Sequence, residues 1–133
     1  MENKAINVVS EFLTAVQTGN MEKVASMVHP EIIWSQPGAN AVSGIKTSAA
    51  EVFEMVSKMF HHSNNTLALT DVKVLAQNGE SVACLVHWKA TQSAGRSLDI
   101  DNIDVYSIKD GRIRETTVYS ADIEQENEFW GKA

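Results

Sequence analysis

Two turn dipeptides in the second half of the chain set the strongest limit on its fold. Asn78-Gly79 and Asp110-Gly111 each lie between two runs rich in β-branched, aromatic and aliphatic residues. Asn-Gly and Asp-Gly favour the tight turns of antiparallel hairpins, because these residues tolerate a positive φ. With the short segment 92–96 joining the hairpins, the sequence predicts a meander of four strands. These strands cover residues 67–77, 81–91, 98–108 and 112–122.

The first half of the chain has helical spacing instead. An apolar stripe at Ile6, Val9, Leu13 and Val16 predicts an amphipathic helix that ends at Gly19-Asn20. Asn20 is the expected N-cap of a second helix, which must end at His29-Pro30 because the residue before proline disfavours helix. A short strand follows at 31–34, and Ser48 with Glu51 forms a capping box for a third helix that continues to Phe60.

This order of elements favours an α+β fold in which helices cover one face of an antiparallel sheet. The chain has 133 residues, the size of one domain with one core, so we expect a single domain over residues 1–133. We see no internal repeat and no linker in the sequence.

Composition excludes several classes of function. The net charge of −6, without a visible basic patch, argues against a nucleic-acid partner. No apolar run is long enough to cross a membrane. Met1 to Lys4 do not resemble a secretory leader, and the lone Cys84 cannot form an internal disulfide, so we expect a cytoplasmic protein.

Three segments carry a resemblance to a known family. They are Phe12 to Asn20 with its Gly-Asn turn, His29 to Gly44 with its short strand and loop, and Ile103 to Tyr119 with Asp110-Gly111. Together they resemble the SnoaL-like and ketosteroid isomerase-like members of the nuclear transport factor 2-like superfamily. The resemblance implies a cone-shaped, cystatin-like α+β barrel, whose curved antiparallel sheet wraps around the N-terminal helices and leaves a ligand pocket. It also implies a homodimer formed through the outer face of the sheet.

The same resemblance identifies a candidate acid and two departures. Asp104 matches the aspartate that both groups of relatives use. Ser35 stands where the isomerase has its catalytic base, and Phe12 stands where it has a tyrosine. Because serine cannot replace a carboxylate as a base, conventional ketosteroid isomerisation is not expected. The cyclase histidine also has no counterpart in 92–96.

Strand alternation places Asn102, Asp104 and Tyr106 on one face of the third long strand. An apolar wall there would raise the pKa of Asp104 and make it a proton donor or shuttle near neutrality. His87, in the preceding strand, is the predicted partner of Asp104 in acid–base chemistry. The alternatives are a surface carboxylate at Asp104 and a histidine that is merely hydrogen-bonded beside the sheet.

The remaining candidates would line the pocket rather than react. A methionine-rich helix can form a pliable wall around an apolar ligand or simply be core. We expect Cys84 to be inert in its strand, no metal at the adjacent His61-His62 or the distant His29, and no cofactor. The C-terminal segment 124–130 is expected to be a surface tail whose Phe129 and Trp130 dock on the domain or on a partner subunit. The predicted substrate-binding residues are Trp34, Phe53, Met55, Met59, Leu85, Asn102 and Tyr119.

The sequence thus favours a protein that holds a small apolar molecule. The first hypothesis is a cofactor-independent isomerase, cyclase or lyase acting on an apolar carbonyl compound, with Asp104 and His87 as proton carriers. The alternatives are a non-catalytic binding protein for a hydrophobic small molecule and an accessory dimerisation domain.

Overall fold

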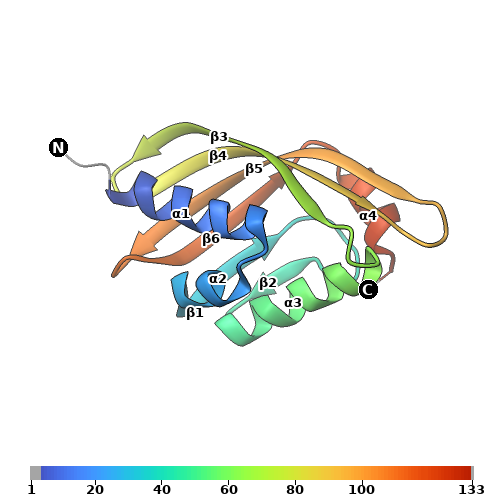
Figure 1. The fold of residues 1–133 in the computed structure, drawn as a ribbon, viewed down its shortest axis with the longest axis horizontal. Helices are drawn as coiled ribbons and strands as arrows, with labels where there is room; N and C mark the ends of the chain where they lie inside the picture. Colours follow the sequence, from blue (N-terminus) through green and yellow to red (C-terminus); the bar gives the residue numbers. More distant parts are fainter. Residues whose placement is uncertain (1–3, 133) are drawn as a thin grey trace.

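The computed structural model describes residues 4–132, which form four helices and six strands. One six-stranded sheet has the order β2-β1-β6-β5-β4-β3. Figure 1 shows α1, α2 and α3 on the concave side of this curved sheet, while α4 lies at one end of it. The elements are α1 Lys4–Thr18, α2 Met21–Met27, β1 Val28–Gln36, β2 Gly44–Lys46, α3 Ala49–His62, β3 Ala68–Asn78, β4 Ser81–Thr91, β5 Ser97–Lys109, β6 Arg112–Ser120 and α4 Ile123–Trp130.

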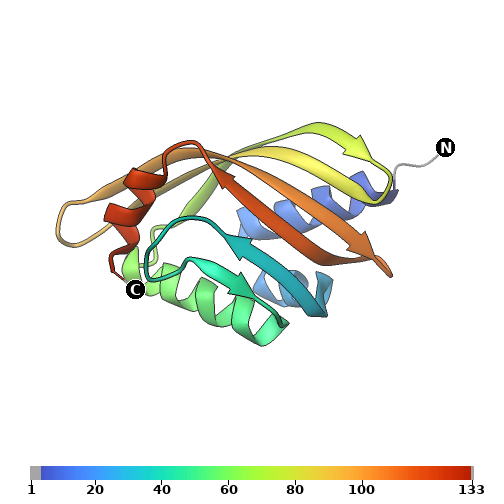
Figure 2. The same cartoon turned by 180° about the vertical axis from the view of Figure 1, so that it is seen from behind.

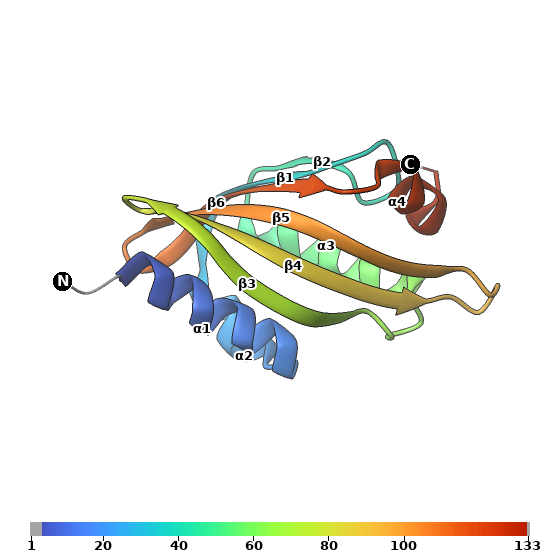
Figure 3. The same cartoon turned by 90° about the horizontal axis from the view of Figure 1, so that it is seen from above.

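The predicted α+β class and the meander of four long strands are confirmed. Figures 2 and 3 show the sheet twisting across the helices from two further directions. Most pairings are antiparallel, but β1 runs parallel to β6, which the sequence did not predict. None of the helices within residues 4–132 has the length and apolar character needed to cross a membrane.

The short strand is longer than predicted. β1 begins at Val28, before Pro30, although proline cannot donate a hydrogen bond to a strand ladder. The pairing of β1 with β6 shifts register between Val28 and Ile33, so the proline lies within an irregular stretch. A bulge there lets β1 continue to Gln36.

The two hairpins form with different turns. Asp110 and Gly111 have φ values of 54° and 73° between the paired Lys109 and Arg112, as a type I′ turn requires. In the first hairpin Asn78 pairs with Ser81, so the turn is formed by the two residues between them and Asn78 itself belongs to β3. Asn78-Gly79 therefore predicted the hairpin correctly, but the turn lies one residue later than the dipeptide indicated.

The predicted helix starts are confirmed. The Asn20 side chain accepts a 3.2 Å hydrogen bond from the backbone N–H of Lys23, and Ser48 accepts one of 3.2 Å from Glu51. These side chains satisfy amide groups that have no partner within the first helical turn. Glu51 in turn accepts a hydrogen bond from the backbone N–H of Thr47, one residue before the cap.

The C-terminal acidic segment is not a surface tail. It forms α4, with Asp122 as N-cap, and the side chains of Phe129 and Trp130 are each 2% exposed against the core of the same chain. The short loop 92–96 between β4 and β5 holds the end of this helix, because Gln92 and Arg96 donate hydrogen bonds to its last carbonyl groups. The helix is therefore fixed to the barrel through both packing and hydrogen bonds.

Asn127 fixes the other side of α4. Its Oδ1 accepts hydrogen bonds from the backbone N–H of Ala39, at 2.8 Å, and from Nδ2 of Asn40, at 2.9 Å. The chain passes close to Asn127 at Gly38, where φ is +96° and an added Cβ would lie 2.7 Å from Asn127 Oδ1. Only glycine combines this backbone conformation with this close approach.

We expect Gly38→Ala to destabilise the protein more than Gly95→Ala. Gly95 has a φ of +88° but open space around it, so alanine there introduces only backbone strain, about 1 to 2 kcal/mol. Gly38→Ala adds the clash with Asn127, so its loss in the free energy of unfolding should exceed that of the control. Urea unfolding of both variants measures the difference, and equal losses would contradict the role given to Asn127.

Candidate functional site

A cavity of about 500 Å³ lies between the helices and the concave face of the sheet. Most of its wall is apolar, with side chains from α1, α2, α3 and the inner faces of the strands. This size and character fit a site for a small organic molecule. Of the predicted site residues, those that line the cavity are Trp34, Phe53, Met55, Met59, Asn102 and Asp104.

Asp104 is buried in this wall. The predicted alternation of β5 is confirmed, since Asn102, Asp104 and Tyr106 are all buried while Asp101 and Ile103 are exposed. The Tyr106 hydroxyl donates a 2.7 Å hydrogen bond to Asp104 Oδ2. The other oxygen, Oδ1, has no hydrogen-bond partner among the described residues.

Burial raises the pKa of Asp104 from 3.8 to about 7. The hydrogen bond from Tyr106 opposes this rise because it stabilises the ionised carboxylate, and the nearby charge of Glu126 adds to it. Asp104 therefore exchanges its proton near neutral pH, which is the range in which a carboxyl group can act as either acid or base.

Tyr106 is held by aromatic packing. Its ring lies edge-on to Phe12, with centroids 5.8 Å apart, and to Trp34, at 6.4 Å. Burial raises the pKa of Tyr106 well above its ordinary value, so the phenol keeps its proton and donates it toward Asp104. Phe12 thus supports the acid by packing. Ser35 does not line the cavity, although its neighbours Trp34 and Gln36 do.

The predicted pair of His87 and Asp104 does not form. Strand alternation puts Cys84 opposite Asp104 in the ladder and His87 opposite Asp101, so the imidazole lies on the outer face of the sheet. There it contacts Asp101 at 2.6 Å and Asp99 at 2.5 Å. The hydrogen bond with Asp101 is the main cause of a raised pKa for His87, with Asp99 acting in the same direction. The prediction placed His87 on the wrong face.

Leu85 and Tyr119 also lie away from the cavity. Leu85 shares the outer face of β4 with His87, and Tyr119 is 58% exposed beside Ile103 on the outer face. Trp88 on β4 and Val118 on β6 line the cavity instead. Neither side chain lies in the pocket as predicted. Alternate residues of a strand point to opposite faces of the sheet, and both Leu85 and Tyr119 point to the face opposite the one that lines the cavity.

Glu126 is the cavity residue that the sequence interpretation missed. It projects from α4 with only 3% of its surface exposed, and it lines the cavity with Asp104. Burial raises its pKa, while Ser120 and Trp130 oppose that rise. The helical spacing of Glu126 with Phe129 and Trp130 was the available signal, since residues three and four apart share one helix face.

Four buried polar atoms of the cavity wall have no hydrogen-bond partner among the described residues. They belong to β5 and α4, and two of them are carboxylate oxygens. Buried polar atoms normally find a partner, and leaving one without is costly. The wall of this otherwise apolar cavity therefore carries polar groups whose hydrogen-bonding capacity the described residues do not fully use, although the Trp130 side chain also acts on Glu126. These atoms are Asn102 Oδ1, Asp104 Oδ1, Glu126 Oε2 and Trp130 Nε1.

Cys84 packs beside this group without a nucleophile's environment. It is fully buried opposite Asp104 in the ladder, and desolvation together with the Asp104 charge raises its pKa to about 11. The thiol is therefore neutral near pH 7, in keeping with the inert role expected for it.

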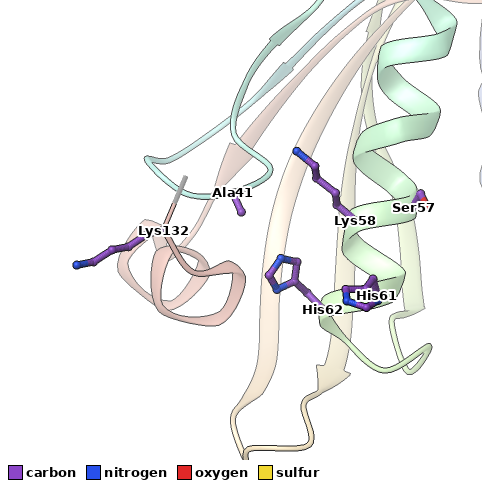
Figure 4. A pocket seen from close by; sticks show the side chains of 6 residues that line it. All are labelled: Ala41, Ser57, Lys58, His61, His62 and Lys132. Atoms are coloured by element: carbon purple, nitrogen blue, oxygen red, sulfur yellow. The ribbon is translucent and has the colours of Figure 1, made fainter.

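A second hollow, of about 510 Å³, lies outside the barrel between α3, Ala41 and the end of the chain. Figure 4 shows Lys58 and His62 directed toward it, whereas the Lys132 side chain extends away. It contains none of the predicted site residues and none of the unpartnered polar atoms described above. The inner cavity is the stronger candidate site.

Comparison with known families agrees with this geometry. Residues 9–116 match the SnoaL-like domain. The chain belongs to the SnoaL-like family. No match was found among curated protein sequences.

Several solved structures have the same fold as this chain. A protein of unknown function with a cystatin-like fold from Xanthomonas campestris is 34% identical, with a TM-score of 0.90 over 96% of this chain and 98% of that one. TerC, co-crystallised with polyporic acid, is 17% identical with a TM-score of 0.81, covering 96% and 98%. An LEH-like epoxide hydrolase from M. tuberculosis is 16% identical with a TM-score of 0.70, covering 96% and 89%. At these lower identities the likeness establishes the fold alone.

Burial of Asp104 should lower the free energy of unfolding at a pH where this carboxyl is ionised. A folded-state pKa of about 7 against 3.8 in the ordinary state means that Asp104 stabilises the fold fully only below about pH 4. That contribution is lost as pH rises toward 7. Asp104→Asn, which cannot ionise, should therefore be more stable than the wild type at pH 8, by on the order of 3 kcal/mol, with little difference near pH 4.

Urea unfolding of both proteins from pH 4 to pH 8 measures this difference. Glu115→Gln, at an exposed position of the neighbouring strand β6, is the control and should gain no stability as pH rises. A stability difference for Asp104→Asn that does not change with pH would show that burial does not hold Asp104 in its neutral form.

Proposed function

We propose that this protein binds an oxygenated, largely apolar small molecule and catalyses proton transfer on it, with Asp104 as the acid. The observation that carries the proposal is the position of Asp104. It is a buried carboxyl with a pKa of about 7 and one unpartnered oxygen, in the wall of an apolar cavity of about 500 Å³.

The chemistry that suits this acid is enolisation of a carbonyl compound. A protonated Asp104 donates its proton to the carbonyl oxygen as a base removes a proton from the α-carbon. Tyr106 then stabilises the carboxylate that remains on Asp104, because its hydroxyl already donates to Oδ2. An isomerase, cyclase or lyase step can each begin in this way.

Relatives of the same fold are compatible with a small-molecule substrate. Their printed descriptions include an epoxide hydrolase and a protein co-crystallised with polyporic acid. The main alternative is a non-catalytic protein that holds a hydrophobic molecule, since the apolar wall serves binding equally well. An accessory dimerisation domain is a further alternative, but that role does not account for the unpartnered polar atoms of the cavity.

Exchange of hydrogen for deuterium tests catalysis without knowledge of the natural substrate. In D₂O at pH 7, the protein should accelerate deuterium incorporation at the α-carbons of 2-decalone, a bicyclic ketone, as followed by mass spectrometry. Asp104→Asn should lower the enzymatic rate at least about 100-fold, because general acid–base groups contribute about 10² to 10⁴ in rate.

Asp101→Asn, on the outer face of the same strand, is the control and should exchange like the wild type. Calorimetry with 2-decalone separates binding from chemistry. A wild type that binds the ketone without accelerating exchange would support the non-catalytic alternative and reject the enzyme.

We also propose that two copies pair through the outer face of the sheet. Leu85, Ile103 and Tyr119 are neighbours across β4, β5 and β6, and together they form an apolar row on the face turned away from α1, α2 and α3. Ile103 is 40% and Tyr119 58% exposed in the single chain. Covering such a row with a second copy removes apolar surface from water.

Ile103→Lys should convert a dimer into a monomer in sedimentation velocity experiments, because it places a charge within that row. Ile45→Lys is the control, since Ile45 is also exposed, at 68%, but lies on β2 at the edge of the sheet. A monomeric wild type at micromolar concentration would refute the dimer.

A further inference from the structure

We propose that Glu126 of α4 is the second proton carrier of this site, the base that works with Asp104, and that the pair selects a neutral oxygenated molecule. This inference rests on the proposed function and deepens it. It assigns the role that His87 does not fill, because His87 lies on the outer face of the sheet.

The first argument is elimination. Among the described residues that line the cavity, only Asp104, Tyr106 and Glu126 carry an acid or base that titrates. Tyr106 keeps its proton, since burial and the nearby Asp104 raise its pKa well above the ordinary value. If Asp104 gives a proton to the ligand, Glu126 is the remaining side chain of the wall that can accept one.

The second argument is the geometry of Glu126. Its carboxyl is buried, lines the same cavity as Asp104 and has one oxygen, Oε2, without a partner among the described residues. A surface helix gains nothing from burying a glutamate in this way. The side chain is also close enough to Asp104 for its charge to raise the pKa of that acid.

The third argument is the way α4 is held. Hydrogen bonds at Gln125, Asn127 and Phe129 connect the helix to three other segments of the chain. Asn127 and Gln125, on either side of Glu126, are therefore both fixed. This support orients the intervening side chain toward the cavity, as a reacting group requires.

The proposed step conserves protons and charge. The Glu126 carboxylate removes the α-proton and the C–H bond breaks, while its electron pair forms the carbon–carbon double bond of an enol. The carbonyl oxygen takes the proton of Asp104. The pair begins with Asp104 protonated and Glu126 ionised, and ends with the proton on Glu126. Return of a proton from Glu126 to carbon, and from the enol oxygen to Asp104, restores both groups.

This arrangement also selects the charge of the substrate. With Asp104 protonated and Glu126 ionised, as the proposed step requires, the pair carries one negative charge, and no lysine, arginine or histidine is among the described residues that line the cavity. Cys84 and Tyr106 face Asp104 as neutral groups, and Asp122 adds further negative charge near Glu126. A carboxylate ligand would be repelled, whereas a ketone or alcohol would not.

Two probes with the same naphthalene ring, one neutral and one a carboxylate, test the selection of charge. At pH 6, where Asp104 is mainly protonated, the wild type should bind 2-naphthol at least tenfold more tightly than 2-naphthoate, as measured by fluorescence titration. Glu126→Gln should reduce that preference at least tenfold. Glu128→Gln, an exposed position of the same helix, should leave it unchanged. Equal affinity of the wild type for both probes would overturn the selection of neutral ligands.

Carboxyl ¹³C NMR tests the pair without any ligand. Glu126→Gln should lower the titration midpoint of Asp104, because the neighbouring negative charge is removed, and Glu128→Gln should not. An unchanged midpoint in Glu126→Gln would overturn the pairing. Glu126→Asp provides a second variant that keeps the charge, so it should retain discrimination against 2-naphthoate while its shortened side chain slows exchange.

The exchange assay with 2-decalone separates the two proposals. Loss of at least about 100-fold in both Glu126→Gln and Asp104→Asn supports the pair. Wild-type exchange in Glu126→Gln with loss in Asp104→Asn would overturn the role of Glu126 and leave the proposed function standing. Wild-type exchange in Asp104→Asn would overturn the proposed function and this inference together.

Discussion

The burial of one carboxyl group in an apolar cavity is the constraint on which the rest of this site depends. Asp104 loses its hydration in the wall of the barrel, and the protein offers it a single hydrogen bond, from Tyr106. Tyr106 is in turn held by the edges of Phe12 and Trp34. Packing, rather than a neighbouring positive charge, thus positions the acid and leaves it neutral for part of the time near pH 7.

The C-terminal helix completes this environment from outside the meander. α4 closes one end of the sheet (Figure 2) and adds a second carboxyl to the cavity wall. Two carboxyl groups that share one apolar space do not ionise independently, so each influences when the other releases its proton. The stability lost by burying them is offset by the packing of Phe129 and Trp130 beneath the helix.

Local signals predicted most of the fold. The Asp110-Gly111 turn, the caps at Asn20 and Ser48 and the alternation of β5 act over a few residues and are found where expected, while Asn78-Gly79 predicted its hairpin with the turn one residue early. Which residues meet across strands is a different matter. His87 has the wrong parity relative to Asp104, and this follows only from the register of β4 and β5. Glu126 escaped prediction because its burial depends on where α4 docks, which involves loops remote in sequence.

The division of the site between barrel and helix has an evolutionary consequence. The match to the SnoaL-like domain covers residues 9–116, which include Asp104, and solved structures of the same fold cover 96% of this chain. A relative that keeps the sheet and Asp104 but carries another residue at position 126 would present a different polar group to the same cavity. The residue at the position of Glu126 is therefore the first one to compare among relatives of this chain.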